Sequence, residues 1–134
     1  MYGSLDAAAS GMVANRIRLE VATANLVNAN TVAGPNGEYS PFRRRMAFIA
    51  SGDPVGGSDS GVHVEKIIQS DSPFRKVYQP WHKFADADGY VNYPDIDPSV
   101  EQVNAMEAMR SYEANVMAAE ATKSMMSLAL RLLA

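Results

Sequence analysis

The sequence DPSVEQVNAMEAMRSYEANVMAAEATKSMMSLALRLL, residues 97–133, predicts one long helix and decides the fold class. Asp97 is a natural N-cap, Pro98 suits the first helical position, and Glu101 lies in the first turn, where the helix dipole favours a negative charge. After Pro98 the stretch contains no glycine or proline before Leu133. We therefore expect an uninterrupted helix of about 36 residues, which spans roughly 54 Å.

Such a helix is too long for a compact body made from a chain of 134 residues. A globule of this size has a radius of gyration of about 14 Å and a width of roughly 36 Å, so the helix should protrude. Two adjacent apolar rows run along it, and together they are wider than one partner helix can cover. The first row is Ala105, Met109, Tyr112, Val116, Ala119, Met126, Leu130 and Leu133, and the second is Ala114, Met117, Ala121, Met125, Leu128 and Leu132.

A second helix is predicted near the N-terminus, where large apolar residues recur every seven positions at Leu5, Met12, Leu19 and Leu26. Ser4 can cap its first turn, and the asparagines and glycines of residues 25–37 should end it. Gly11 weakens this helix by about 1 kcal/mol relative to alanine, and close approach of another backbone would explain its presence. This helix can cover one apolar row of the long helix, which leaves the other row for neighbouring subunits.

The segment between the helices is rich in turn-forming residues and contains short runs that favour β-strands. Those runs are Phe42–Ile49, Gly61–Ile68, Phe74–Tyr78 and Gly89–Tyr93. We expect a small β-hairpin region, with residues 51–61 as a flexible loop. The predicted fold is mainly α with a small β region. Residues 1–33 and 97–134 form an α-helical hairpin or coiled coil, and residues 34–96 form an irregular, hairpin-containing middle.

The composition argues against several functional classes. The net charge of −3 disfavours general nucleic-acid binding, which needs a basic face. The absence of cysteine excludes disulfides, thiolate zinc sites and cysteine nucleophiles. The sequence shows no secretory signal peptide and no apolar stretch of about 18 residues, so we expect no direct membrane insertion. A role outside the cytoplasm would therefore require another export route.

The sequence contains no recognisable motif for catalysis, cofactor binding or metal binding. His63 and His82 are the only histidines and lack a metal-ligand spacing, so we predict no catalytic residue, no cofactor and no metal. Residues 86–89 share part of a calcium-loop pattern, but Phe84 takes the first ligand position, which favours a simple acidic turn. The basic cluster at residues 43–45 is interpreted either as the solvated face of a short strand or as a contact with an acidic neighbour.

Both ends of the chain carry strings that are typical of one family. They are Leu5-Asp6, Ala9–Met12 and the asparagine-rich Ala24–Thr31 near the start, and Arg110–Val116 and Lys123–Met125 near the end. These strings resemble the bacterial flagellar axial family, which includes rod, hook and filament proteins. The middle residues Ser72–Pro80 and Gly89–Val91 are similar to a proximal rod member of that family.

The resemblance implies a structural, non-enzymatic subunit of the basal-body rod, which spans the periplasm. It implies export through the flagellar type III apparatus without a cleaved signal peptide. The terminal helices would stack helically into the inner tube of a torque-transmitting shaft. Expected partners are other copies of the chain, the rod proteins FlgB, FlgF and FlgG, and the rod base protein FliE. The expected subunit-interface residues are Leu5, Met12, Leu19, Asn25, Leu26, Asn28, Met109, Tyr112, Val116, Met117, Met126, Leu130 and Leu133.

A small soluble helical-hairpin adaptor or binding module is the alternative from another functional class. An adaptor should stay monomeric with protease-resistant ends, whereas a rod subunit should have labile ends in isolation. An enzyme is the third alternative, and it would need a catalytic constellation that the sequence does not contain.

Overall fold

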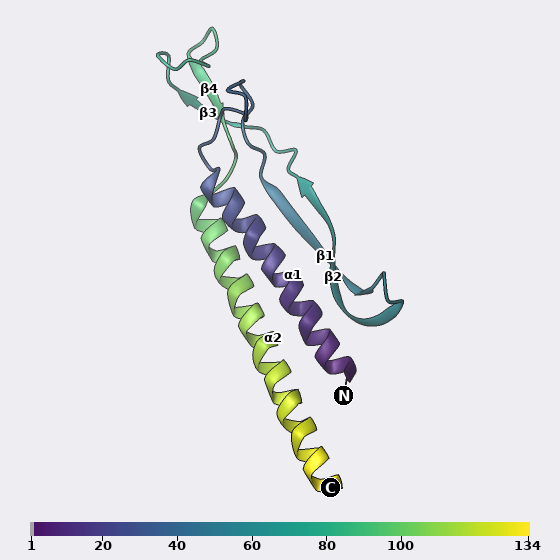
Figure 1. Ribbon diagram of the computed structural model, residues 1–134. Helices are drawn as coiled ribbons and strands as arrows, with labels where there is room; N and C mark the ends of the chain where they lie inside the picture. The colour runs from purple at the N-terminus through teal and green to yellow at the C-terminus, as the bar shows by residue number, and fades with distance from the viewer. Residues whose placement is uncertain (1) are drawn as a thin grey trace.

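The computed structural model describes residues 2–134 and contains two long helices joined by a β-rich middle (Figure 1). Helix α1 covers Tyr2–Val27 and helix α2 covers Pro98–Leu133. The two helices run antiparallel and side by side, and α2 continues past the N-terminal end of α1 (Figure 1). The predictions of a mainly α fold, a terminal helical hairpin and a protruding long helix are confirmed.

The two helices begin differently. Asp97 precedes α2 in an extended conformation, and its Oδ1 accepts a hydrogen bond from the backbone N–H of Ser99 at 2.9 Å, as an N-cap should. The expected start of the first helix near Ser4 is wrong, because α1 already includes Tyr2 and Gly3. Tyr2 and Gly3 are exposed, so water can reach their backbone N–H groups.

The strands of residues 2–134 form two separate antiparallel hairpins. Strand β1, Arg45–Asp53, pairs with β2, Ser58–Gln69, and strand β3, Arg75–Tyr78, pairs with β4, Tyr90–Tyr93. Each of the four predicted β-favouring runs overlaps one of these strands. The runs 74–78 and 89–93 contain β3 and β4, whereas β1 and β2 extend beyond the runs that predicted them.

The prediction of a flexible loop at residues 51–61 is wrong. Ser51 pairs with Val62 and Asp53 pairs with Ser58, so residues 51–53 and 58–61 belong to strands and the turn is limited to residues 54–57. Gly57 lies in this turn and Gly52 lies at a register shift, with φ angles of 67° and 87° that other residues rarely adopt. The glycines therefore allow a tight, irregular hairpin end, whereas their abundance had suggested an open loop.

Helix α1 lies between α2 and the β1–β2 hairpin, and the β3–β4 hairpin lies beyond the end of the helical pair where α2 begins (Figure 1). Ser10 Oγ accepts a hydrogen bond from the Val62 backbone N–H at 3.1 Å, which fixes β2 to α1. Among the described elements, α2 packs against α1 only. Most of the circumference of α2 is therefore left uncovered by its own chain.

Small side chains form the seam between the two helices. The buried residues of α1 are Ala8, Gly11, Ala14, Asn15, Ala22 and Asn25, and those of α2 are Glu101, Ala108 and Thr122. A Cβ atom at Gly11 would lie 2.6 Å from Oδ1 of Asn115, so this glycine makes room for a side chain of α2. The expected neighbour, another backbone, is wrong in this detail.

Candidate functional site

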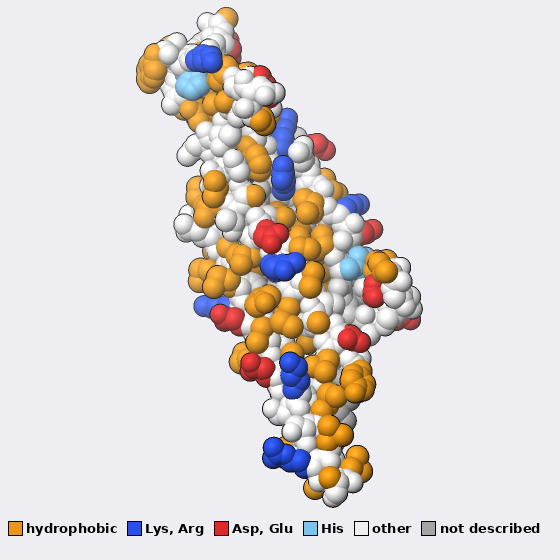
Figure 2. Space-filling model, in the orientation of Figure 1, with side chains coloured by type: hydrophobic (Ala, Val, Ile, Leu, Met, Phe, Trp, Pro, Cys, Tyr) orange, Lys and Arg blue, Asp and Glu red, His pale blue; other side chains and the backbone are white. Residues whose placement is uncertain are grey.

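The second predicted apolar row of α2 is exposed along its whole length. Met117 is 63% exposed and Leu132 is 86% exposed, and the other members of the row are exposed as well. We call this surface the outer row, and it consists of Ala114, Met117, Ala121, Met125, Leu128 and Leu132. Figure 2 shows hydrophobic side chains gathered along the helical part of the molecule down to its tip.

Helix α1 covers only one edge of the first predicted row. Val116 and Met126 are half-buried, whereas Met109, Tyr112, Leu130 and Leu133 are exposed. The expectation that the N-terminal helix would cover a whole row is therefore wrong. Helix α1 does not cover the row because it faces a neighbouring line of small and polar side chains on α2. That line consists of Glu101, Ala108, Asn115 and Thr122.

The large apolar residues of α1 lie next to this partly covered row. Leu5 lines an open groove at the tip together with Met126 and Leu130. Residues spaced by seven positions share one side of a helix, so the half-buried row that starts at Leu5 continues along α1 beside the row of α2. We call this shared surface the hairpin face, and it consists of Leu5, Met12, Leu19, Leu26, Met109, Tyr112, Val116, Met126 and Leu130.

The two asparagines that were assigned to the subunit interface make contacts within the chain. Asn28 is half-buried, and its side chain donates to the Ala24 carbonyl and accepts from the Thr31 hydroxyl, at 2.8 and 3.1 Å. The Asn28 backbone N–H donates to the same Ala24 carbonyl at 3.1 Å, so these bonds hold Asn28 at the turn that follows α1. Asn25 is 1% exposed and belongs to a buried polar network.

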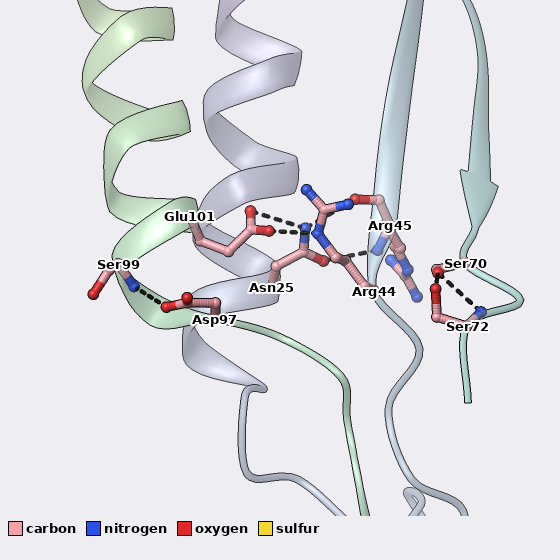
Figure 3. A network of polar contacts seen from close by, with 8 residues as sticks. All are labelled: Asn25, Arg44, Arg45, Ser70, Ser72, Asp97, Ser99 and Glu101. Atoms are coloured by element: carbon pink, nitrogen blue, oxygen red, sulfur yellow. Dashed lines mark hydrogen bonds and ion pairs between the residues drawn. The ribbon is translucent and has the colours of Figure 1, made fainter. Parts of the chain in front are cut away.

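That network joins three segments that are far apart in the sequence (Figure 3). The Asn25 amide donates to the Arg45 carbonyl at 2.8 Å and accepts from the Arg45 backbone N–H at 2.9 Å, as a neighbouring strand would. Its Nδ2 also donates to Glu101 Oε2 at 3.2 Å, and Arg44 Nε donates to Glu101 Oε1 at 2.6 Å. This network, which we call the polar junction of Asn25, Arg44, Arg45 and Glu101, was not predicted from the sequence.

A signal for the polar junction is present in the sequence. Glu101 lies seven residues before Ala108 and therefore on the same side of α2, and Asn25 lies at the corresponding end of α1. Glu101 was assigned only to a favourable position for the helix dipole. A carboxylate on a side that faces another helix needs a partner, and that requirement could have predicted a buried ion pair.

The basic cluster does not form a solvated strand face. Arg44 binds Glu101, and the Arg43 guanidinium lies 3.8 Å from the centre of the Phe74 ring and donates to the Ser72 carbonyl at 2.7 Å. Arg45 is exposed, with its guanidinium 5.3 Å from the centre of the Phe42 ring. Two of the three arginines thus fasten the start of β1 to the rest of the chain.

The remaining polar candidates support turns and the hairpin end. Asp86 Oδ1 accepts from the backbone N–H groups of Asp88 and Tyr90, which confirms the acidic turn. His63 Nδ1 lies 2.8 Å from the Gly52 carbonyl oxygen. Hydrogen bonds from the backbone N–H groups of Val55 and Gly56 lower the pKa of Asp53 below its ordinary value of 3.8.

Within residues 2–134 no group of three His, Asp or Glu side chains is placed to hold a metal ion.

Comparisons with known proteins agree with this architecture. The family model "Flagella basal body rod protein" matches residues 5–35, and "Flagellar basal body rod FlgEFG protein C-terminal" matches residues 87–132. The flagellar basal-body rod protein FlgC of Bacillus subtilis (strain 168) is 39% identical to the chain, with 98% of this chain and 97% of the relative covered. This chain belongs to the FlgC family of flagellar basal-body rod proteins.

Other members of the FlgC family lead to the same assignment. FlgC of Escherichia coli O6:H1 is 42% identical over 90% of this chain and 89% of its own length. FlgC of Aquifex aeolicus is 36% identical over 92% of this chain and 90% of its own length. The resemblance inferred from the termini and the middle is thereby confirmed, and the chain is a structural subunit of the flagellar basal-body rod. None of its described helices has the length and hydropathy that crossing a membrane requires.

Proposed function

We propose that this chain assembles into the proximal rod through the hairpin face and the outer row of its two helices. The observation that carries the proposal is the uncovered apolar surface of α2, where Met109, Met117 and Leu130 are 49%, 63% and 67% exposed. Burial of such surface stabilises association by about 25 cal/mol per Å² of apolar area. The hairpin face is partly covered by the α1–α2 contact and the outer row is exposed throughout, so the two rows offer separate surfaces to neighbours.

The proposed neighbours are further copies of the chain, the rod proteins FlgB, FlgF and FlgG, and the rod base protein FliE. Stacked helically, the helical hairpins form the inner tube, and the β-hairpins pack outward and stiffen the shaft against torque. The subunit reaches the rod, which spans the periplasm, through the flagellar type III export apparatus without a cleaved signal peptide. In this role the chain provides binding surfaces and no catalysis.

The proposal is tested with the double variant Met109→Asp/Leu130→Asp in motile cells. Both side chains are exposed, so the purified variant should keep its helix content and its unfolding midpoint in urea. Rod assembly and swimming in soft agar should be lost, because each carboxylate would have to be desolvated at an apolar contact. Ser99→Asp/Gln102→Asp is the matched control, since it adds the same charge at exposed polar positions of α2. Normal motility of the Met109→Asp/Leu130→Asp cells refutes the proposal.

A further inference from the structure

The seam between α1 and α2 specifies the alignment of the helices only weakly. Facing residues are small on both helices, and on α2 they recur every seven positions at Ala108, Asn115, Thr122 and Ala129. A slip of seven residues moves one helix along the other by about 10 Å and places one small side chain where another had been. Apart from the fit of the Asn115 side chain over Gly11, shape therefore distinguishes poorly between the observed register and its neighbours.

The polar junction exists in one register only. Asn25 and Glu101 are 1% and 2% exposed and meet at the end of the hairpin where α1 finishes and α2 begins. A slip in one direction places Asn25 beside Ala108, and a slip in the other carries it past the first residue of α2. Either slip separates Glu101 from Asn25 inside the protein, and a buried carboxylate that loses its partners is strongly destabilising.

The junction also fixes the start of strand β1 against the two helices. The Asn25 amide holds the backbone of Arg45 on both its N–H and its carbonyl, and Arg44 reaches the same carboxylate of Glu101 (Figure 3). Every buried side-chain nitrogen and oxygen of the described residues has a hydrogen-bond partner. Fully satisfied buried networks specify a unique packing, and selection of register is the best-attested role of buried polar groups.

We propose that Asn25, Arg44 and Glu101 are positioning residues that select the register of the helical hairpin in the unassembled subunit. The register decides how far α2 projects beyond α1, and therefore which residues of the tip, such as Leu130 and Leu132, are presented to a neighbour. The junction would thus define the shape of the assembly surface without contacting any partner.

The absence of native cysteine allows a direct test by paired spin labels in the purified full-length chain. Labels are attached at Glu20→Cys on α1 and Glu120→Cys on α2, which are both exposed. In the chain that carries the two labels and no further substitution, the measured distance between the labels should have one narrow distribution. In Glu101→Ala and in Asn25→Ala, a second population should appear, displaced by about 10 Å, as a seven-residue slip requires.

Two variants separate register selection from simple stabilisation. Glu101→Gln keeps an acceptor oxygen and should restore the single distance. Glu107→Ala is the matched control, because Glu107 lies on the same helix and pairs with an arginine, Arg18, at 3.5 Å, but its side chain is 62% exposed. The Glu107→Ala variant should therefore show a single distance between the two spin labels.

The triple variant Asn25→Leu/Arg44→Leu/Glu101→Leu covers the case in which single alanine variants unfold, because it keeps the site filled while removing its polarity. A second distance in this variant supports the proposal. One native distance in the triple variant, loss of its helical hairpin, or a broad distribution in the unchanged chain overturns it. None of these outcomes bears on the proposed rod interface, which is tested by assembly.

Discussion

Asn25, in the last turn of α1, donates a hydrogen bond to Glu101, in the first turn of α2, across 76 positions of the sequence. They are the two most deeply buried polar side chains among the described residues, at 1% and 2% exposure. Their contact fastens the closed end of the hairpin, where the middle segment leaves α1 and returns to α2. Towards the open end the described contacts include the small residues Ala8 and Gly11 and the apolar Leu5, so the stability of the helical pair should decrease from the polar junction towards the tip.

The first prediction concerns the stability that Glu101 confers. Glu101→Ala leaves Arg44 without its carboxylate and the Asn25 amide without one acceptor, and should lower the free energy of unfolding by about 3–5 kcal/mol. Glu107→Ala removes an exposed ion pair and should change it by no more than about 1 kcal/mol. Urea denaturation followed by circular dichroism measures both. Equal effects of the two substitutions would show that burial of Glu101 adds nothing to stability.

The second prediction concerns Gly11 and the space it leaves for Asn115. Gly11→Leu forces a large side chain against the Asn115 amide and should destabilise the hairpin by about 1–3 kcal/mol, although leucine favours helix more than glycine does. Gly3→Leu in the same helix is the control, because a Cβ atom at Gly3 meets nothing within 4 Å. Thermal and urea unfolding of the two variants should separate clearly. If Gly11→Leu is as stable as Gly3→Leu, the seam is looser than described.

The third prediction separates the two apolar surfaces of α2. Met117→Asp/Leu128→Asp places two charges in the outer row and leaves the hairpin face unchanged. We expect a normally folded monomer whose incorporation into rods, measured in purified basal bodies, falls at least tenfold because the carboxylates oppose burial. Normal incorporation of this variant, together with failure of the Met109→Asp/Leu130→Asp variant, would restrict assembly to the hairpin face.

The fourth prediction follows from the lowered pKa of Asp53. Backbone N–H groups of Val55 and Gly56 stabilise its carboxylate in the folded chain, so the folded pKa lies below the ordinary 3.8. The stabilisation is complete above pH 3.8 and is lost as the pH falls through the lowered folded pKa. The amide resonance of Val55 should shift over that lower range in an NMR titration. In Asp53→Asn this shift should vanish, and its persistence would assign the titration to another group.

The sequence is sufficient to predict the helices because their signals are local. Asp97 and Pro98 mark the start of α2, and the absence of glycine or proline up to Leu133 predicts its length. The position of the seam could not be predicted as readily. Large apolar residues at Leu5 and Met12 formed the more visible periodic pattern, whereas contact with α2 is made by Ala8 and Gly11, which carry little hydrophobic signal.

The polar junction and the paired part of residues 51–61 depend on segments that meet only in the folded chain. Nothing near Glu101 in the sequence shows that Arg44 will reach it, since 57 positions separate them. The turn at residues 54–57 has the composition of a loop, but pairing of Asp53 with Ser58 continues the strands to its edges. Long-range pairing of this kind overrides local composition.

The small side chains of the seam also affect how the subunit responds to mechanical load. Alanine and glycine have no side-chain rotamers, so the contacts made by Ala8, Gly11 and Ala22 cannot adjust by a change of rotamer. A twisting force applied to one helix is then transmitted to the other with little elastic loss along the helical contact. Longer, flexible side chains at the same positions would change rotamer under load and make the helical pair more compliant.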